Sequence, residues 1–168
     1  MSLSADNLPD AEQLCEQLAD QLQALIQENN IDNPFLVGIR TGGAWIADRL
    51  QQKLQLEEPG ILDISFYRDD FSQRGLAPQV KGSDLPDSIE DRHIILVDDV
   101  IMSGRTIRAA MNELFDFGRP ASIHLVTLLD VGRRQLPIQP DLCAAQIALN
   151  DDQAIKLTGP EPLELSLV

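Results

Sequence analysis

The sequence predicts one α/β domain with a mostly parallel central sheet and helices on both faces. Strand-like and helix-like segments alternate along its 168 residues, which is typical of parallel sheets. Residues 94–97 are apolar without interruption, as in a central strand buried on both faces. Glycine-bearing turns directly follow two of the predicted strands. In such folds ligands bind beyond the carboxyl ends of the strands, so these turns are the first place to look for a site.

The first half of the chain is predicted to contain helices at residues 10–30 and 44–54 and strands at residues 35–39 and 61–67. Both helices are predicted from apolar residues that recur at three- and four-residue steps. Pro34 disfavours helix just before the first strand, and a glycine-rich turn, Thr41-Gly42-Gly43, follows that strand. The second strand is predicted from its content of β-formers and its partial alternation.

The second half is predicted to contain strands at residues 94–97, 122–129 and 142–149 and a helix at residues 107–115. That helix ends before Gly118, with Pro120 beyond it. The last residues, around Pro160 and Pro162, are expected to form an edge strand or a tail. Between the two halves, residues 68–91 carry several glycines and prolines and little periodicity. A segment of this kind predicts either disorder or a functional lid.

The charge balance argues against nucleic acid as a general partner. The 27 acidic and 13 basic residues leave a net charge of −14, and seven acids precede the first basic residue, Arg40. Such a surface repels phosphate backbones unless its basic residues cluster, although a local pocket can still bind a small anion. No apolar stretch approaches the roughly 18 residues of a membrane span, and the acidic N-terminus lacks a signal peptide's basic start. We therefore expect a cytoplasmic protein outside the membrane.

Several reaction classes lack their characteristic residues. Cys15 and Cys143 have no metal-ligand spacing and are predicted to be reduced core thiols. His93 precedes a predicted strand and His124 lies within one, so both are interpreted as surface or hydrogen-bonded residues rather than general bases. A zinc site built from these four isolated residues is a minor alternative. The sequence also contains no nucleophile elbow, Walker motif or dinucleotide-binding glycine pattern.

The strongest chemical signal follows the apolar strand at residues 94–97. Asp98 and Asp99 come at the end of this strand, and Ser103, Gly104 and Thr106 open the next helix. Backbone N–H groups of a glycine turn and a helix N-terminus form a phosphate cradle, to which hydroxyls add donors. The two carboxylates can accept hydrogen bonds from sugar hydroxyls or help to hold a divalent metal. The alternative is that the acids only solvate the strand end while Ser103 caps the helix, but the convergence of all these groups favours a phosphorylated sugar.

A second candidate loop lies between Gly38 and Gly43. It places Arg40, Thr41 and the backbone amides at another strand end, where glycines allow close approach and Arg40 can pair with phosphate oxygens. A diphosphate suits this arrangement. Taken alone, the turn is equally consistent with an ordinary connection between a strand and a helix.

These residues resemble the type I phosphoribosyltransferases, whose signature is a hydrophobic strand, two acidic residues and a short phosphate loop. The likeness extends to the PyrR family of uracil phosphoribosyltransferases that also regulate pyrimidine operons, and it runs in order over residues 37–141. The segments that carry the likeness are Asp63-Ile64-Ser65-Phe66-Tyr67-Arg68-Asp69-Asp70, Val80-Lys81-Gly82, Val97-Asp98-Asp99-Val100, Gly104-Arg105-Thr106, Phe117-Gly118-Arg119-Pro120 and Leu136-Pro137-Ile138.

The resemblance implies a type I phosphoribosyltransferase fold in which residues 1–168 form a single domain with a lid loop near residues 68–91 and a small hood within residues 131–168. It implies that uracil and phosphoribosyl pyrophosphate react with Mg²⁺ as cofactor to give UMP and pyrophosphate. Asp98 and Asp99 would hold the ribose hydroxyls and help to hold the metal, and with Arg40 they are the expected catalytic residues. The implied substrate-binding residues are Arg40, Thr41, Gly42, Arg68, Asp98, Asp99, Met102, Ser103, Gly104, Arg105, Thr106, Arg133 and Arg134.

The sequence departs from the family pattern at several of these positions. Thr41-Gly42-Gly43 replaces Thr-Arg-Gly in the pyrophosphate loop, and Met102-Ser103 replaces Tyr-Thr. The block at residues 130–135 differs from the family's Asp-Arg-Gly-His-Arg-Glu at three of six positions, so we expect reduced activity. Met102 also stands where purine transferases of the superfamily have an acid, which disfavours a purine substrate.

The resemblance leaves a second function open. In this alternative the protein is a regulator that senses UMP or UTP, has little or no catalytic activity and can bind RNA. The basic residues available for RNA are few against the acidic total, so weak or absent RNA binding is expected. A homo-oligomer, either a dimer or a larger assembly, is expected from the family.

Overall fold

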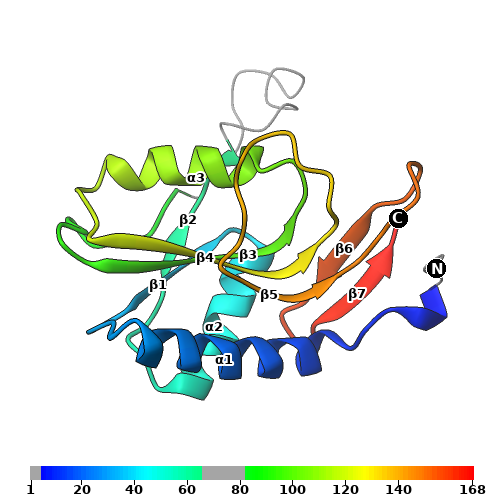
Figure 1. Ribbon diagram of the computed structural model, residues 1–168, viewed down its shortest axis with the longest axis horizontal. Coiled ribbons are helices and arrows are strands. Elements are labelled where there is room, and N and C mark those ends of the chain that lie inside the picture. Colours follow the sequence, from blue (N-terminus) through cyan, green and yellow to red (C-terminus); the bar gives the residue numbers. More distant parts are fainter. Residues whose placement is uncertain (1–4, 66–81) are drawn as a thin grey trace.

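The computed structural model describes residues 5–65 and 82–168, and its core is a five-stranded parallel sheet (Figure 1). The strands lie in the order β2-β1-β3-β4-β5. A short 3-10 helix, η1 (Ala5–Asn7), precedes the first α-helix. The bounds are β1 (Phe35–Ile39), β2 (Gly60–Leu62), β3 (His93–Ile101), β4 (Ser122–Asp130), β5 (Leu142–Gln146), α1 (Ala11–Glu28), α2 (Gly42–Leu54) and α3 (Arg105–Phe115). The predicted α/β class is confirmed.

Helices cover both faces of the sheet, as predicted. Figure 1 shows α1 and α2 below the sheet and α3 above it. On the lower face, Leu18 of α1 and Leu50 of α2 pack with Val97 of β3. On the upper face, Ile107 of α3 packs with Leu96, the neighbour of Val97 in the same strand. Because successive side chains of a strand point to opposite faces, a continuous apolar strand can serve both layers.

The strand order places a switch point between β1 and β3. The chain runs from β1 to β2 on one side of the sheet and then continues from β3 to β4 and β5 on the other. The connections that leave β1 and β3 therefore diverge to opposite faces and leave a crevice at their carboxyl ends. This is where ligands bind in open α/β sheets. Both glycine-bearing loops singled out in the sequence lie at this edge.

The structure corrects the bounds of several predicted elements. The strand expected at residues 142–149 ends at Gln146, and the helix expected from residue 107 begins at Arg105. The strand expected at residues 61–67 comprises only Gly60–Leu62, because its pairing with β1 ends at Leu62. The amide of Asp63 then donates to the Ser83 hydroxyl, and the Asp63 carboxylate accepts the amide of Ser65. Residues 66 and 67 lie outside the described residues. The strand expected at residues 94–97 is longer, since β3 pairs with β4 as far as Ile101. The acids at 98 and 99 are therefore inside a strand. Helix α2 begins two residues earlier than expected, at Gly42.

The predicted lid segment is described only from residue 82 onward, and this part is attached to the body of the protein. Asp84 and Ile61 exchange backbone hydrogen bonds of 2.7 and 2.9 Å. The amide of Ile89 donates to the Phe117 carbonyl, and the Ile89 side chain is fully buried. The lid prediction therefore concerns residues 68–81, which lie outside the described residues.

The C-terminal residues form a separate two-stranded antiparallel sheet, the hood, rather than an edge strand or a tail. Its strands are β6 (Ile155–Thr158) and β7 (Glu164–Leu167). Glu12 of α1 anchors the turn between them, because its carboxylate accepts hydrogen bonds from Arg49 and from the amide of Leu163. The bond to Arg49 is the main reason that the pKa of Glu12 lies below its ordinary value. This anchor places the hood beside the carboxyl ends of β3 and β4 (Figure 1).

The two cysteines are free thiols, as predicted. Cys15 is buried in α1, and this burial raises its pKa to about 12. Cys143 on β5 is half-buried, and burial raises its pKa as well. Within the described parts of the chain, no helix has the length and apolar character to cross a membrane.

Candidate active site

The loop after β3, residues 102–106, has the geometry of an anion cradle. Gly104 precedes the first turn of α3 with φ +92°, a conformation that glycine adopts without strain. The hydroxyl of Ser103 accepts the amide of Arg105 at 3.1 Å, which shapes the turn. The next amides of α3 lie at a helix N-terminus, where the helix dipole favours negative charge. The loop therefore combines unbonded donors with a favourable field.

A cavity of about 140 Å³ lies against this cradle. It is bounded by Asp98 on β3, by Ser103 and Gly104 in the loop, and by Thr106 and Ile107 at the start of α3. A carboxylate thus faces hydroxyls and helix amides across one small space. These are the groups that a sugar phosphate needs, with hydroxyls at one end and a phosphate at the other.

The two adjacent acids point in different directions. Asp98 is buried, lines this cavity and accepts the amide of Asp99 at 2.9 Å. Asp99 faces the loop after β1, where a Cβ placed on Gly42 would come within 2.8 Å of the Asp99 Cγ. The Oδ1 atom of Asp99 accepts the amide of Val100 at 2.8 Å. One acid therefore belongs to the phosphate cradle, and the other lies between the two loops.

The loop after β1 carries the second set of predicted residues. Arg40 is half-buried, with its Nε 3.8 Å from Asp63 Oδ2 and a long bond of 3.4 Å from its guanidinium to the Gly82 carbonyl. Thr41 is exposed and precedes α2 without a side-chain cap bond. Arg40 and Thr41 both line a separate cavity of about 260 Å³ with Trp45, the single tryptophan of the chain. Arg40 and the N-terminus of α2 thus lie on one side of Asp99, and the phosphate cradle lies on the other.

A larger cavity of about 350 Å³ lies between the end of β3 and the segment that leads into β6. Val100 and Met102 line both this hood pocket and the phosphate cavity. Val131 and Leu149 add apolar walls, and the backbone and side chains of residues 151–154 close the other side. A flat ring with polar edges fits such a lining. The two cavities share a boundary at Val100 and Met102, so a ligand can occupy both.

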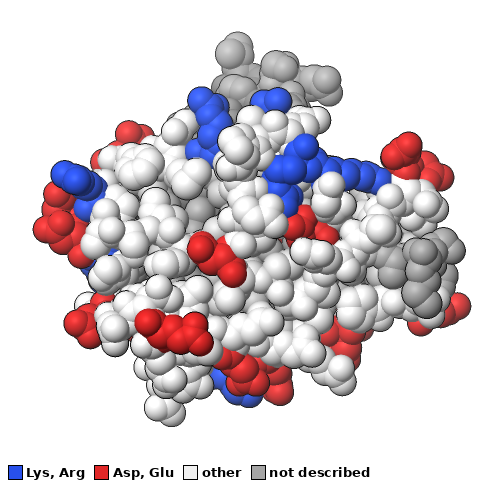
Figure 2. Space-filling model, in the orientation of Figure 1, with Lys and Arg blue, Asp and Glu red and all other residues white. Residues whose placement is uncertain are grey.

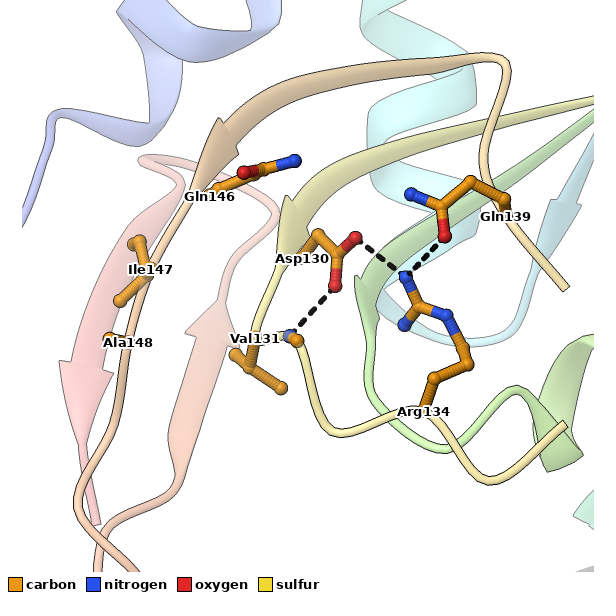
Figure 3. Close-up of a pocket in the computed structure, with 8 residues that line it drawn as sticks. Asp130, Val131, Arg134, Gln139, Gln146, Ile147 and Ala148 are labelled. Carbon is orange, nitrogen blue, oxygen red and sulfur yellow. Dashed lines mark hydrogen bonds and ion pairs between the residues drawn. The ribbon is translucent and has the colours of Figure 1, made fainter. Parts of the chain in front are cut away.

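Three of the predicted arginines are already held by other groups of the protein. Arg105 donates to Gln135 Oε1 at 2.9 Å, and Arg133 donates to the carbonyls of Leu149 and Asn150. Arg134 donates to Asp130, Gln139 and the carbonyl of Met102 (Figure 3). Of these three, Arg133 lines the hood pocket and Arg134 lines a different cavity, of about 610 Å³, beyond Asp130.

The structure thus brings most of the predicted site residues to one edge of the sheet. Arg68 lies outside the described residues, and Met102 is about half exposed at the junction of the two cavities. Leu149 and residues 151–154 were not among the residues predicted for the site. They come from a loop after a weak strand, and no sequence signal tied that loop to the phosphate cradle.

A scan of family models matches the phosphoribosyl transferase domain to residues 4–153. Among the similar proteins is Bifunctional protein PyrR of Pseudomonas savastanoi, which is 55% identical over 162 residues that cover 96% of this chain and 95% of that protein. Bifunctional protein PyrR of Pseudomonas aeruginosa is 54% identical over 160 residues, 95% of this chain and 94% of its own length. The chain belongs to the PyrR family. The matches cover nearly all of this chain and of the two PyrR proteins, and the resemblance stated from the sequence is confirmed.

Solved structures support the fold assignment. A hypoxanthine-guanine phosphoribosyltransferase from Bacillus anthracis superposes with a TM-score of 0.69 at 21% identity and covers 92% of this PyrR-family chain and 88% of its own. A hypoxanthine phosphoribosyltransferase from Staphylococcus aureus superposes with a TM-score of 0.64 at 23% identity, covering 86% and 77% of the two chains. At such identities the likeness concerns the fold alone. It agrees with the central parallel sheet and its flanking helices.

Proposed function

We propose that this PyrR-family protein is a uracil phosphoribosyltransferase that makes UMP and pyrophosphate from uracil and phosphoribosyl pyrophosphate. The observation that carries the proposal is the shared boundary of the phosphate cavity and the hood pocket at Val100 and Met102. A nucleoside monophosphate needs this arrangement, with its phosphate in the cradle, its ribose beside the acids and its base under the hood. The family membership supports the same reaction class.

In this proposal the phosphate loop binds the 5′-phosphate through the amides at the start of α3 and the hydroxyls of Ser103 and Thr106. Asp98 accepts a ribose hydroxyl from within the cavity that it lines. Asp99 faces the other loop and lies where the ribose meets the leaving group. Arg40, with the amides of Thr41 and Gly42, binds the pyrophosphate. The contact of Arg68 with substrate stays a prediction, as does a direct contact of Arg133 or Arg134 with the base.

The reaction breaks the bond between the anomeric carbon and a pyrophosphate oxygen and forms a bond from that carbon to a uracil ring nitrogen. The nitrogen loses its proton to solvent or to the departing pyrophosphate. Positive charge develops on the ribosyl ring, where the carboxylates of Asp98 and Asp99 stabilise it. Negative charge develops on the pyrophosphate, opposite Arg40 and the loop amides. Preorganised charges of this kind are commonly the largest contribution to rate.

The residues at the site fit a magnesium ion that is shared with the substrate. Among the described residues there is no cluster of three protein groups that could hold a metal by itself. Mg²⁺ is commonly bound by one or two carboxylates together with substrate phosphates and water, and Asp98 and Asp99 supply such carboxylates. When bound, the ion neutralises charge on the leaving pyrophosphate.

The direct test is to incubate the purified protein with uracil, phosphoribosyl pyrophosphate and Mg²⁺ and to follow UMP by chromatography. UMP formation that depends on all three is expected, and hypoxanthine or guanine in place of uracil should give none because Met102 stands where a purine enzyme has an acid. Fluorescence of Trp45, which shares a cavity with Arg40 and Thr41, should report the binding of phosphoribosyl pyrophosphate independently of turnover. Binding without UMP at high protein concentration would reject the enzyme.

The second candidate function is a nucleotide-sensing regulator that binds RNA. Figure 2 shows Lys and Arg side chains gathered near α3 and the segment after β4, while Asp and Glu dominate the lower edge over α1. This local gathering is the observation that favours an RNA contact, against a net charge of −14. We expect weak RNA binding by the chain alone. A filter-binding assay with a pyrimidine-operon leader RNA at physiological salt measures it, and nanomolar affinity would make regulation the main function.

The family resemblance also predicts a homo-oligomer. This stays a prediction for the present chain. Size-exclusion chromatography with light scattering would give its mass in solution, and a monomer at micromolar concentration would contradict the expectation.

A further inference from the structure

The buried pair Asp130–Arg134 lies directly behind the phosphate loop. Asp130 ends β4, is only 4% exposed and accepts the amide of Gly132 at 2.8 Å on one carboxylate oxygen. Its other oxygen accepts the guanidinium of Arg134 at 2.6 Å. Figure 3 shows the Arg134 side chain reaching back toward Asp130, with Gln139 on the far side. A charged group held by a buried carboxylate at such short range has little freedom to move.

The same guanidinium also bonds to the phosphate loop. Arg134 Nη1 donates to the carbonyl of Met102 at 2.9 Å, while Nη2 serves Asp130 and Gln139. The aliphatic part of the Arg134 side chain also lies beside the loop. A Cβ built on Gly104 would be 3.6 Å from the Cδ of Arg134. The side chain therefore connects the end of β4 to both sides of Ser103.

Backbone bonds beside Arg134 reinforce this connection. The carbonyl of Ser103 accepts the amides of Gln135 and Leu136 at 2.9 and 3.1 Å. The side chain of Gln135 in turn accepts Arg105 at 2.9 Å. Residues 134–136 thus bond to three positions around the loop glycine, Met102 and Ser103 before it and Arg105 after it. The loop carbonyls point backward into these bonds, which leaves the amides at the start of α3 directed toward the cavity.

We propose that Arg134 is a positioning residue that holds the phosphate loop in its binding conformation before substrate arrives, with Asp130 as its fixed anchor. The inference rests on the proposed function, because the ligand of the loop is the 5′-phosphate. Among the described residues, Arg134 is not part of the lining of the phosphate cavity or the hood pocket. In this proposal Arg134 acts on the ligand through the shape of the loop, in place of the direct base contact that the family resemblance predicts.

The role needs a guanidinium and cannot be met by positive charge alone. The planar group uses separate nitrogens for Met102 and Asp130, and a lysine ammonium at the same position presents a single nitrogen on a flexible stem. If Arg134 instead attracted phosphate by charge, lysine would serve almost as well. The Arg134→Lys variant therefore separates positioning from attraction.

The experiment measures the dissociation constant of ribose 5-phosphate by calorimetry for the wild type, Arg134→Met, Arg134→Lys and Arg108→Met. Arg108 is exposed on α3, so its replacement by methionine removes the same charge nearby without touching the bonds described above. Thermal unfolding of each variant identifies folded protein. We expect the dissociation constant to rise roughly tenfold or more in Arg134→Met and almost as much in Arg134→Lys, and by less than about twofold in Arg108→Met.

Steady-state kinetics supply the second measurement. Loss of loop positioning raises the KM for phosphoribosyl pyrophosphate more than it lowers kcat, and it leaves the KM for uracil within about twofold when the other substrate is saturating. A raised KM for uracil with unchanged ribose 5-phosphate binding would overturn the inference and point to direct base contact. Wild-type affinity in Arg134→Lys would also overturn it. If Arg134→Met does not fold, the lysine variant decides alone. A wild type that does not bind ribose 5-phosphate would reject the proposed function itself.

Discussion

The loop after β3 and the loop after β1 lie at the same edge of the sheet, but different contacts hold them. The phosphate loop is bonded from behind, through Arg134 and the amides of Gln135 and Leu136. The loop after β1 has fewer such bonds among the described residues: the Arg40 amide donates to the Leu62 carbonyl at 2.9 Å, and the Arg40 side chain makes a distant ion pair and one long hydrogen bond. Gly42 packs closely against Asp99. A bonded loop is ready for a ligand before it arrives. A loop held by packing can adjust when a pyrophosphate binds and leaves.

The largest effect is expected from Asp99→Asn, which removes the charge that lies between the two loops. The carboxylate is replaced by an amide of the same shape, so the fold should be retained while kcat falls by roughly 100-fold or more. Single-turnover UMP formation measures the chemical step, and circular dichroism checks the fold. An unchanged rate would show that this acid plays no part in the reaction.

Gly42→Ala tests the packed loop itself. The new methyl group would overlap the Asp99 carboxylate, so either the acid or the loop must shift. We expect kcat to fall by about 100-fold, since small misplacements at a reacting centre have effects of this size. Ribose 5-phosphate binding should change by less than about twofold, because the other loop is untouched. Equal losses in both measurements would mean that the two loops are not independent.

Gly104→Ala tests the phosphate loop, and its expected effect is smaller. An alanine at φ +92° is strained by roughly 1–2 kcal/mol, and relief of this strain distorts the turn. The KM for phosphoribosyl pyrophosphate should rise about tenfold while kcat changes little. Gly118→Ala is a useful control, because Gly118 also has positive φ but follows the far end of α3, away from the loop. If the control raised this KM as much, general strain would explain the result.

The smallest effect on activity is expected from Asp130→Asn. This variant should have a clear effect on stability, and that effect should depend on pH. Burial opposes ionisation of Asp130, but its bonds with Arg134 and the Gly132 amide hold its pKa below the ordinary value of 3.8. A lowered pKa means that the folded state binds the proton less well than the unfolded state. The charged pair therefore stabilises the fold above that ordinary value, and its contribution is lost as the pH falls through the lower folded pKa.

Urea unfolding of the wild type and of Asp130→Asn checks this expectation. The free energy of unfolding should differ by about 2 kcal/mol near neutral pH, and the difference should shrink as the pH falls below the ordinary value of 3.8. A difference that does not depend on pH would show that the shape of the residue matters and its charge does not.

Much of the fold was predictable because its signals are local. The apolar periodicity of α1 and the uninterrupted strand β1 lie at the predicted positions, and Gly118 follows the predicted end of α3. The errors have non-local causes. Strand β3 continues past Asp98 and Asp99 because β4 offers pairing partners there, against the expectation that two acids mark a strand end. Strand β2 stops at Leu62 because its partner β1 ends.

The candidate site also has one part that was predictable from the sequence and one part that was not. The acid pair, the phosphate loop and Arg40 follow strands directly, so the rule that strand ends meet at one edge was enough to bring them together. The hood pocket was not predictable, since Val131 and Leu149 are brought together by the pairing of β4 with β5 and by the bond of Arg133 to the Leu149 carbonyl. The bonds of Arg134 also depend on a partner outside its own loop, the carbonyl of Met102, 32 residues away.

The sequence by itself determined the parallel α/β class, the two glycine-bearing loops and the acid pair, because each is a short segment whose composition carries its own chemistry. Only the tertiary structure decided which way each acid faces and that the hood pocket borders the phosphate cavity. It also decided that Arg134 bonds to Asp130 and Met102 rather than lining either of these two cavities. The physical reason is that direction and pairing depend on neighbours from other strands, and a carboxylate or guanidinium bonds to whatever the fold brings within about 3 Å.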